Sequence, residues 1–239
     1  MAPDSVRRAL SPARLRPTAP IAADALLVGD PGRALLLAQE LLETPKMSNH
    51  ARGLWGYSGK AVESGRELTI QATGMGGPSA AIVLADLAEL GVRRAVRIGT
   101  CVAIEPQPGP ADLLVVLEAH AWGGSGAGEA VLPDPRLTAR LRETLRAAGH
   151  SGVAARPAIV ASLDVLHQSG SGESSRYAER VDAADMQTAT LLARSEALGL
   201  AVAAVLIVAE SANGEQADDE RIEAAAKGAG VAAAAALSG

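Results

Sequence analysis

The chain has 239 residues, of which 48% are hydrophobic and 21% charged, a profile typical of a globular protein with a sizeable buried core. Its 22 basic and 27 acidic residues give a formal net charge of −5, which argues against a broad basic face for nucleic acid. The single cysteine, Cys101, excludes an intramolecular disulfide framework and suits a reducing, cytoplasmic compartment. The longest apolar stretch, residues 198–209, is shorter than the roughly 20 residues that span a bilayer, so no membrane partner is expected.

The N-terminal segment differs from the rest of the chain in composition. Prolines interrupt residues 1–20, and we expect this segment to form a flexible arm. Residues 21–239 contain no internal repeat and no linker. They are therefore expected to form a single domain.

The first half of this domain alternates apolar runs with glycine-rich turns. The run at 25–28 predicts a strand, and Gly29-Asp30-Pro31-Gly32 turns the chain into a helix expected over 33–42. A second strand, over 68–73, is expected to end at Gly74-Met75-Gly76-Gly77. Pro78 stands where the first residue of an amphipathic helix is expected.

The second half repeats the alternation. Strands are expected over 95–98, 113–117, 153–161 and 202–208, and helices over 135–148, 186–198 and 218–237. Strands that are continuous apolar runs are typical of a sheet covered on both faces. The pattern predicts an α/β fold, a three-layer sandwich with a central mostly parallel (mixed) β-sheet flanked by helices.

Arginine and glycine lie together at several predicted strand ends, where α/β folds bind their ligands. Gly29 and Arg33 follow one strand, and Arg97, Gly99 and Thr100 lie at the end of another. Guanidinium groups, backbone N–H groups and a hydroxyl are the usual components of a phosphate or sulfate pocket. Taken one loop at a time, however, ordinary turns explain the glycines better.

Other known sites do not fit. No Gly-x-Gly-x-x-Gly follows a strand, and no Walker spacing precedes Lys60. The four histidines show no i, i+4 pairing with one another or with Cys101, so no catalytic metal site is expected.

Four segments become specific in combination: Gly29-Asp30-Pro31-x-Arg33, Gly74-Met75-Gly76, Arg97-x-Gly99-Thr100-Cys101 and Asp185-Met186-Gln187. Together they resemble the nucleoside phosphorylase family, in its branch of hexameric purine nucleoside phosphorylases and uridine phosphorylases. Order and spacing match over roughly residues 18–225. The resemblance implies a nucleoside phosphorylase-like fold and a pentosyltransferase activity. That activity is phosphorolysis of an N-glycosidic bond, giving free base and (deoxy)ribose 1-phosphate, with orthophosphate as co-substrate and no cofactor.

The resemblance also implies roles for individual residues. The phosphate-binding positions are Gly29, Arg33, Arg52, Arg97 and Thr100. The ribose-binding positions are Met75, Met186 and Gln187, and the base-binding positions are Leu166 and His167. The catalytic positions are Glu210, which is implied to protonate the leaving base, and Arg221, which assists it. Arg52 is implied to reach the phosphate site of a neighbouring subunit, so a homo-oligomer (a dimer or a trimer of dimers) is expected.

Several positions depart from the family pattern. Gln187 replaces a glutamate and accepts hydrogen bonds through only one oxygen, which weakens the expected hold on the ribose. Stacking aromatics are absent at Leu166 and His167, and Glu210 is one methylene longer than the family's aspartate. These departures leave open whether the chain is fully active.

Three alternatives to a purine nucleoside phosphorylase remain. A uridine or pyrimidine nucleoside phosphorylase is supported by Thr100 and by Thr190-Leu191-Leu192, but residues 168–172 lack the Gln-x-Arg pair that grips uracil. A hydrolytic nucleosidase is disfavoured by the presence of the phosphate arginines. A non-catalytic nucleoside-binding relative is the third. An acid at Glu210 suits the N7 atom of a purine, so a purine is favoured, while the exact base, ribose against deoxyribose, and dimer against hexamer stay open.

Overall fold

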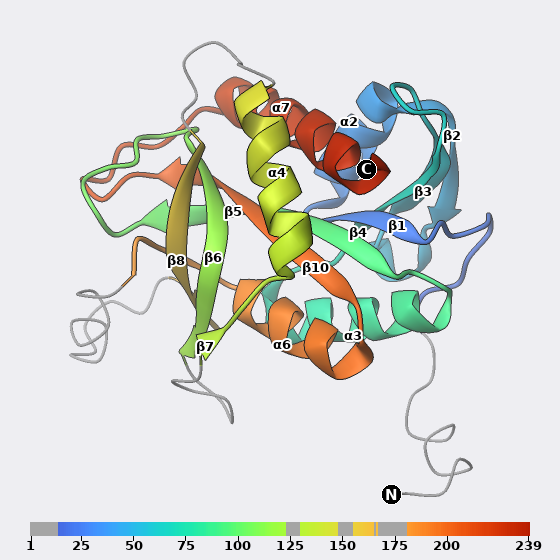
Figure 1. The fold of residues 1–239 in the computed structure, drawn as a ribbon, viewed down its shortest axis with the longest axis horizontal. Coiled ribbons are helices and arrows are strands. Elements are labelled where there is room, and N and C mark those ends of the chain that lie inside the picture. Colours follow the sequence, from blue (N-terminus) through green and yellow to red (C-terminus); the bar gives the residue numbers. More distant parts are fainter. Residues whose placement is uncertain (1–13, 123–129, 148–154, 165, 167–180) are drawn as a thin grey trace, which may run out of the picture.

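The computed structural model describes residues 14–122, 130–147, 155–164, 166 and 181–239 (Figure 1). Its elements in chain order are β1 (Asp24–Val28), α2 (Pro31–Leu41), β2 (Leu42–Asn49), the 3-10 turn η1 (Ala51–Gly53), β3 (Gly56–Ala61), β4 (Glu67–Ala72), α3 (Gly76–Glu89), β5 (Arg94–Ala103), β6 (Leu113–Trp122), β7 (Ala130–Val131), α4 (Pro135–Ala147), β8 (Ala155–Leu163), β9 (Ala183–Asp185), α6 (Thr188–Leu198), β10 (Ala201–Glu210) and α7 (Asp219–Ser238).

The strands form a mixed sheet in the order β10-β6-β8-β9-β5-β1-β4-β3-β2. Parallel pairs join β4 to β1, β1 to β5 and β5 to β10, whereas β3 pairs antiparallel with both β2 and β4. A further pairing of β10 with β5 closes the strands from β10 to β5 into a ring. Helices α2, α4 and α7 cover one face of the sheet, and α3 and α6 cover the other (Figure 1). The expected mixed sheet with flanking helices is thus confirmed.

Small residues let α7 approach α2 closely. The buried face of α7 consists almost entirely of alanines, and Gly230 lies among them. A Cβ atom on Gly230 would lie 2.8 Å from Cδ2 of Leu37 and 3.1 Å from Cδ1 of Leu41, so a larger residue here would force the buried Leu37 side chain to shift.

Some predicted boundaries differ from the structure. The strand expected over 95–98 continues through Gly99 and Thr100, because β5 keeps its pairing with β10 as far as Val102. Helix α3 begins at Gly76, two residues before Pro78. Strand β2 escapes prediction because it is polar, mostly exposed and contains Pro45.

The segment before β1 is packed where it is described. Residues 1–13 of the expected arm lie outside the described residues. The Leu15 side chain is buried, and its backbone N–H donates to the Asp86 carboxylate at 2.8 Å. The next N–H, of Arg16, donates to Oδ1 of Asn49 at 2.9 Å. This part of the arm is therefore anchored to α3 and to the end of β2, and the single domain expected over 21–239 stays a prediction.

Candidate active site

The turn after β1 contains Gly29 and leads into helix α2. Asp30 caps the helix, because its Oδ1 accepts from the backbone N–H of Arg33 at 2.8 Å, and Pro31 occupies the first helical position. A Cβ atom on Gly29 would lie 3.5 Å from the carbonyl oxygen of Gly74 and 3.8 Å from Oε1 of Gln187. The β1–α2 turn therefore lies directly beside the loop that follows β4.

The Arg33 guanidinium lies half-buried at this turn with no hydrogen-bond acceptor among the described residues. Burial lowers the pKa of Arg33, the nearby Asp30 carboxylate opposes this, and the Arg97 charge lowers it further. Two guanidinium groups thus lie close enough to repel each other. An anion between them would relieve that repulsion and supply the missing acceptor.

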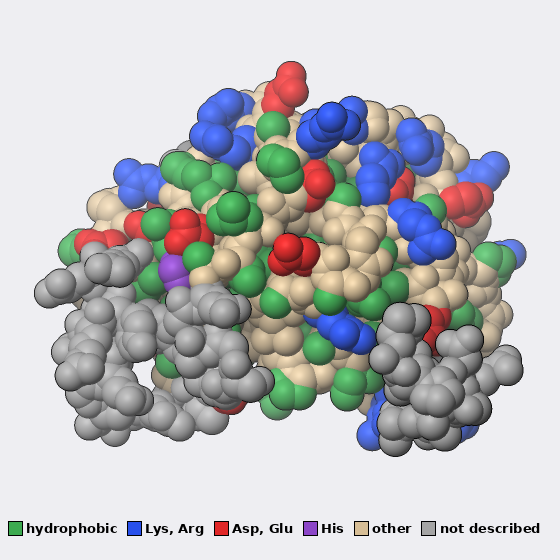
Figure 2. Space-filling model, turned by 60° about the horizontal axis from the view of Figure 1, so that its bottom comes forward, with side chains coloured by type: hydrophobic (Ala, Val, Ile, Leu, Met, Phe, Trp, Pro, Cys, Tyr) green, Lys and Arg blue, Asp and Glu red, His purple; other side chains and the backbone are tan. Residues whose placement is uncertain are grey.

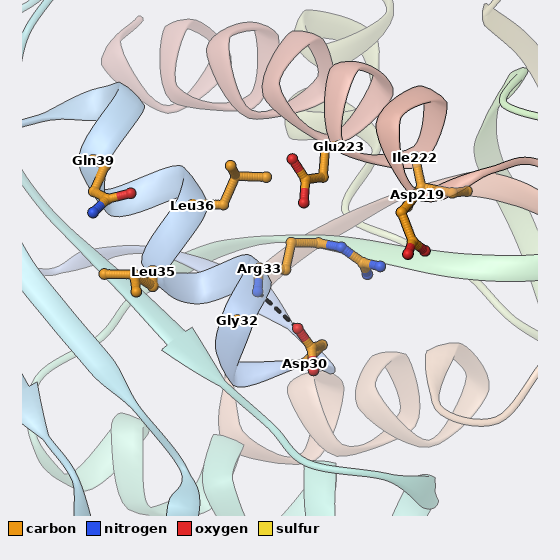
Figure 3. Close-up of a pocket in the computed structure, with 9 residues that line it drawn as sticks. All are labelled: Asp30, Gly32, Arg33, Leu35, Leu36, Gln39, Asp219, Ile222 and Glu223. Carbon is orange, nitrogen blue, oxygen red and sulfur yellow. Dashed lines mark hydrogen bonds between the residues drawn. The ribbon is translucent and has the colours of Figure 1, made fainter.

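A hollow of about 440 Å³ opens beside Arg33, between α2 and the start of α7. Figure 3 shows the Arg33 side chain pointing from α2 towards Asp219 of α7, with Asp30 below it. The hollow is lined by Asp30, Gly32, Arg33, Leu35, Leu36, Gln39, Asp219, Ile222 and Glu223.

Arg97 is held on the adjacent strand β5 and is only 4% exposed. Its Nε donates to Oγ1 of Thr188 at 3.0 Å, its Nη1 to Oε1 of Gln187 at 2.7 Å, and its Nη2 to Oδ2 of Asp185 at 2.8 Å. A Cβ atom on Gly99 would lie 2.6 Å from Nη2, so the guanidinium folds back over a position where only glycine leaves it room. Three of the five N–H groups are thereby used, and the other two have no acceptor among the residues that the structure describes.

Asp185 is the fully buried partner that organises this corner. One oxygen accepts from the hydroxyl of Ser162, and the other accepts from Oγ1 of Thr188 at 2.6 Å and from Arg97. The sequence pattern placed Asp185 in a motif without assigning it a role. The available signal was its position as an acid directly before Met186 and Gln187 at a strand end.

The remaining predicted ligand-binding residues lie around this corner in different degrees of exposure. Met75 is 86% exposed between Gly74 and Gly76, whose φ angles are +73° and +78°. Thr100, Met186 and Leu166 are half-buried, at the end of β5, before α6 and after β8. His167 lies outside the described residues.

Arg52 is exposed in the turn η1, which joins β2 to β3. Its φ of 60° and ψ of 20° are left-handed, a conformation that costs a non-glycine residue roughly 1–2 kcal/mol. Two side chains stabilise the turn: the Asn49 amide donates to the carbonyl of Ala51 at 3.3 Å, and the Gln71 amide donates to that of Leu54 at 2.9 Å. Arg52 is therefore an exposed residue held in a left-handed turn.

Glu210 and Arg221 are not joined by an ion pair in the part of the chain that the structure describes. Glu210 is half-buried at the end of β10 and accepts from Nε2 of Gln216 at 3.4 Å. Arg221, near the start of α7, instead donates from Nη2 to the carbonyl of Pro110 at 2.6 Å. The carboxyl group of Glu210 is therefore paired with Gln216 and not with Arg221.

Three general features bear on other functions. Among the described residues, no group of three or more His, Cys, Asp and Glu side chains could hold a metal ion. No helix in the described ranges is long and apolar enough to cross a membrane. Basic and acidic side chains are interspersed on the face seen in Figure 2.

Comparison with known proteins gives consistent matches over most of the chain. The model of a family described as the phosphorylase superfamily matches residues 24–238. A DeoD-type purine nucleoside phosphorylase of Geobacillus kaustophilus is 30% identical over 200 residues, covering 81% of this chain and 83% of the relative. The enzyme of the same name from Alkaliphilus metalliredigens is 29% identical over 208 residues, or 84% and 88% of the two chains. In fold, the chain is similar to the crystal structure of the purine nucleoside phosphorylase from Toxoplasma gondii in complex with immucillin-H, with a TM-score of 0.81 at 22% identity, covering 91% of this chain and 90% of that one.

Proposed function

Since the chain belongs to the phosphorylase superfamily, we propose that it cleaves the N-glycosidic bond of a purine nucleoside with orthophosphate, giving free base and (deoxy)ribose 1-phosphate. The observation that carries the proposal is the half-buried Arg33 guanidinium at the Gly29 turn, which has no acceptor among the residues that the structure describes and is close enough to Arg97 for that charge to lower its pKa. Such a cationic pocket at a helix N-terminus favours a phosphate ion.

In the proposed reaction, Gly29, Arg33, Arg97 and Thr100 hold the phosphate. One phosphate oxygen forms a bond with C1′ of the sugar while the bond from C1′ to the base breaks, and the electron pair of that bond leaves with the base. The negative phosphate stabilises the positive charge that develops on the sugar, because the site holds the two groups close together and excludes the water that would weaken their attraction.

Glu210 is the proposed proton donor to the leaving base, with Arg221 as its assistant. Its carboxyl group must carry a proton to act, and a purine can accept that proton at N7. Met75 and Met186 are proposed to pack against the sugar, and Leu166 and His167 against the base. The relatives named as purine nucleoside phosphorylases support a purine, as does an acid in place of an arginine at position 210.

Nucleosides incubated with and without orthophosphate provide the test. Base release, followed by absorbance, is expected only with phosphate, faster for purine nucleosides than for uridine, and accompanied by a sugar 1-phosphate. Release of base without phosphate would indicate a hydrolase, and preference for uridine would indicate a pyrimidine enzyme. Binding without turnover would leave a nucleoside-binding protein.

We also propose a cytoplasmic homo-oligomer, a dimer or a trimer of dimers, in which Arg52 completes the phosphate site of a neighbouring subunit. Its exposed, left-handed turn and the partly exposed apolar side chains of Met47 and Trp55 on either side of it support this arrangement. Mixing inactive Arg52→Ala and inactive Arg97→Ala subunits should then restore some activity, since some mixed sites contain both arginines. No recovery under proven subunit exchange would contradict a shared site.

A further inference from the structure

The Gln187 side chain connects three parts of the site. Its Oε1 accepts from Nη1 of Arg97 at 2.7 Å and from Oγ1 of Thr73 at 3.0 Å. Its Nε2 donates to the carbonyl oxygens of Gly74 at 2.7 Å and of Gly76 at 3.2 Å. A glutamine amide has two donor hydrogens and two acceptor lone pairs, so this one is fully used by the protein.

The neighbours also determine which way the amide points. Arg97 can only donate, so it must face the amide oxygen, and the two glycine carbonyls can only accept, so they must face the NH₂ group. The side chain is only 3% exposed, which leaves no free polar atom of Gln187 for a ligand. Gly74 and Gly76, whose carbonyls accept from the Gln187 amide, both have left-handed backbone conformations, which glycine adopts without strain.

We propose that Gln187 is a positioning residue that locks the Arg97 guanidinium to the loop of residues 73–76, and that it does not bind the sugar hydroxyls. The proposal rests on the proposed function for the role of Arg97 as a phosphate ligand. The same side chain also contacts the turn after β1, because Gly29 packs against both the Gly74 carbonyl and the Gln187 amide oxygen. The amide thereby sets the spacing between the phosphate-binding turn, Arg97 and the loop that carries Met75.

Glutamine is the residue this environment requires. A carboxylate at position 187 could still accept from Arg97 but has no hydrogen to donate, so it would place an oxygen about 2.7 Å from the carbonyl oxygen of Gly74. Leucine, of similar size, would lose the contacts on both sides. Gln187→Glu therefore removes only the hydrogen bonds to the Gly74 and Gly76 carbonyls, whereas Gln187→Leu also removes the hydrogen bond from Arg97.

The first test compares each variant on a ribonucleoside and its 2′-deoxy analogue. With Gln187→Leu the KM for phosphate should rise about ten-fold, and kcat/KM should fall by the same factor for both sugars. With Gln187→Glu the KM for phosphate should stay near that of the wild type while the KM for the nucleoside rises. If Gln187→Leu changes the ratio of ribo to deoxy kcat/KM about ten-fold with unaltered phosphate dependence, Gln187 binds the sugar and the proposal is wrong.

The second test needs no activity. Amide hydrogen exchange over residues 73–79 should be about ten-fold faster in Gln187→Glu than in the wild type, because the two loop carbonyls lose their donor. Thr138→Val on α4 is the matched control, since Thr138 is also buried and lies on the opposite face of the sheet. Unchanged exchange in both Gln187 variants would overturn the lock. A wild-type protein that fails to release base would overturn the proposed function alone and leave this second test to decide.

Discussion

Replacing Asp185 with alanine should destabilise the protein strongly, because it leaves the Arg97 guanidinium buried without a counter-charge. The Arg97 side chain is 5% exposed, that of Asp185 is 0% exposed, and their polar atoms lie 2.8 Å apart. Removing one partner of such a buried pair costs about 3–5 kcal/mol, since the remaining charge keeps its desolvation penalty. Ser162 and Thr188 also lose their acceptor in this variant.

The free energy of unfolding, measured by urea denaturation with circular dichroism, checks this prediction. Arg97→Ala should also destabilise the protein, because it leaves Asp185 unpaired. The double variant should cost less than the two single losses added together, by about 1–3 kcal/mol, since neither charge then remains buried alone. Saturating phosphate should recover part of the loss in Asp185→Ala by giving Arg97 another anion. Additive losses, or a loss below about 1 kcal/mol for Asp185→Ala, would refute a coupled buried pair.

Three further predictions concern phosphate binding, helix packing and the proton donor. Arg33→Ala should raise the KM for phosphate by a factor equivalent to about 1.5–3 kcal/mol, whereas Arg146→Ala on the exposed end of α4 should leave it unchanged. Gly230→Ala should destabilise the chain by about 1–3 kcal/mol because its Cβ would lie 2.8 Å from Leu37, whereas Gly228→Ala, in the same helix with nothing within 4 Å, should stabilise it by about 0.4–1 kcal/mol in thermal or urea unfolding. Glu210→Ala should lower kcat most for nucleosides whose base leaves poorly without a proton, and an equal loss for all leaving groups in steady-state assays would contradict its role as an acid.

Much of the fold could be predicted from the sequence because its strands and helices carry local signals. The run at residues 25–28 is confirmed as β1, and Asp30 and Pro31 start α2 as a cap and a first helical residue do. The hairpin of β2 and β3 could not be predicted in the same way. Five consecutive residues of β2 are exposed, so its strand pairing depends on β3 and on no apolar pattern of its own.

In the candidate site, too, local features could be predicted from the sequence, whereas contacts between distant residues could not. The motifs indicate which residue types gather at the strand ends, because glycine turns and caps act within a few positions of themselves. The closing of the sheet by β10 and β5, and the partners of Asp185 and Gln187, were decided by tertiary structure alone. Arg97 is 88 positions from Asp185, and the Gly74 carbonyl is 113 positions from the amide that holds it. A buried polar atom takes whatever partner the packed chain brings to it, and that choice is made only when the sheet and its helices have come together.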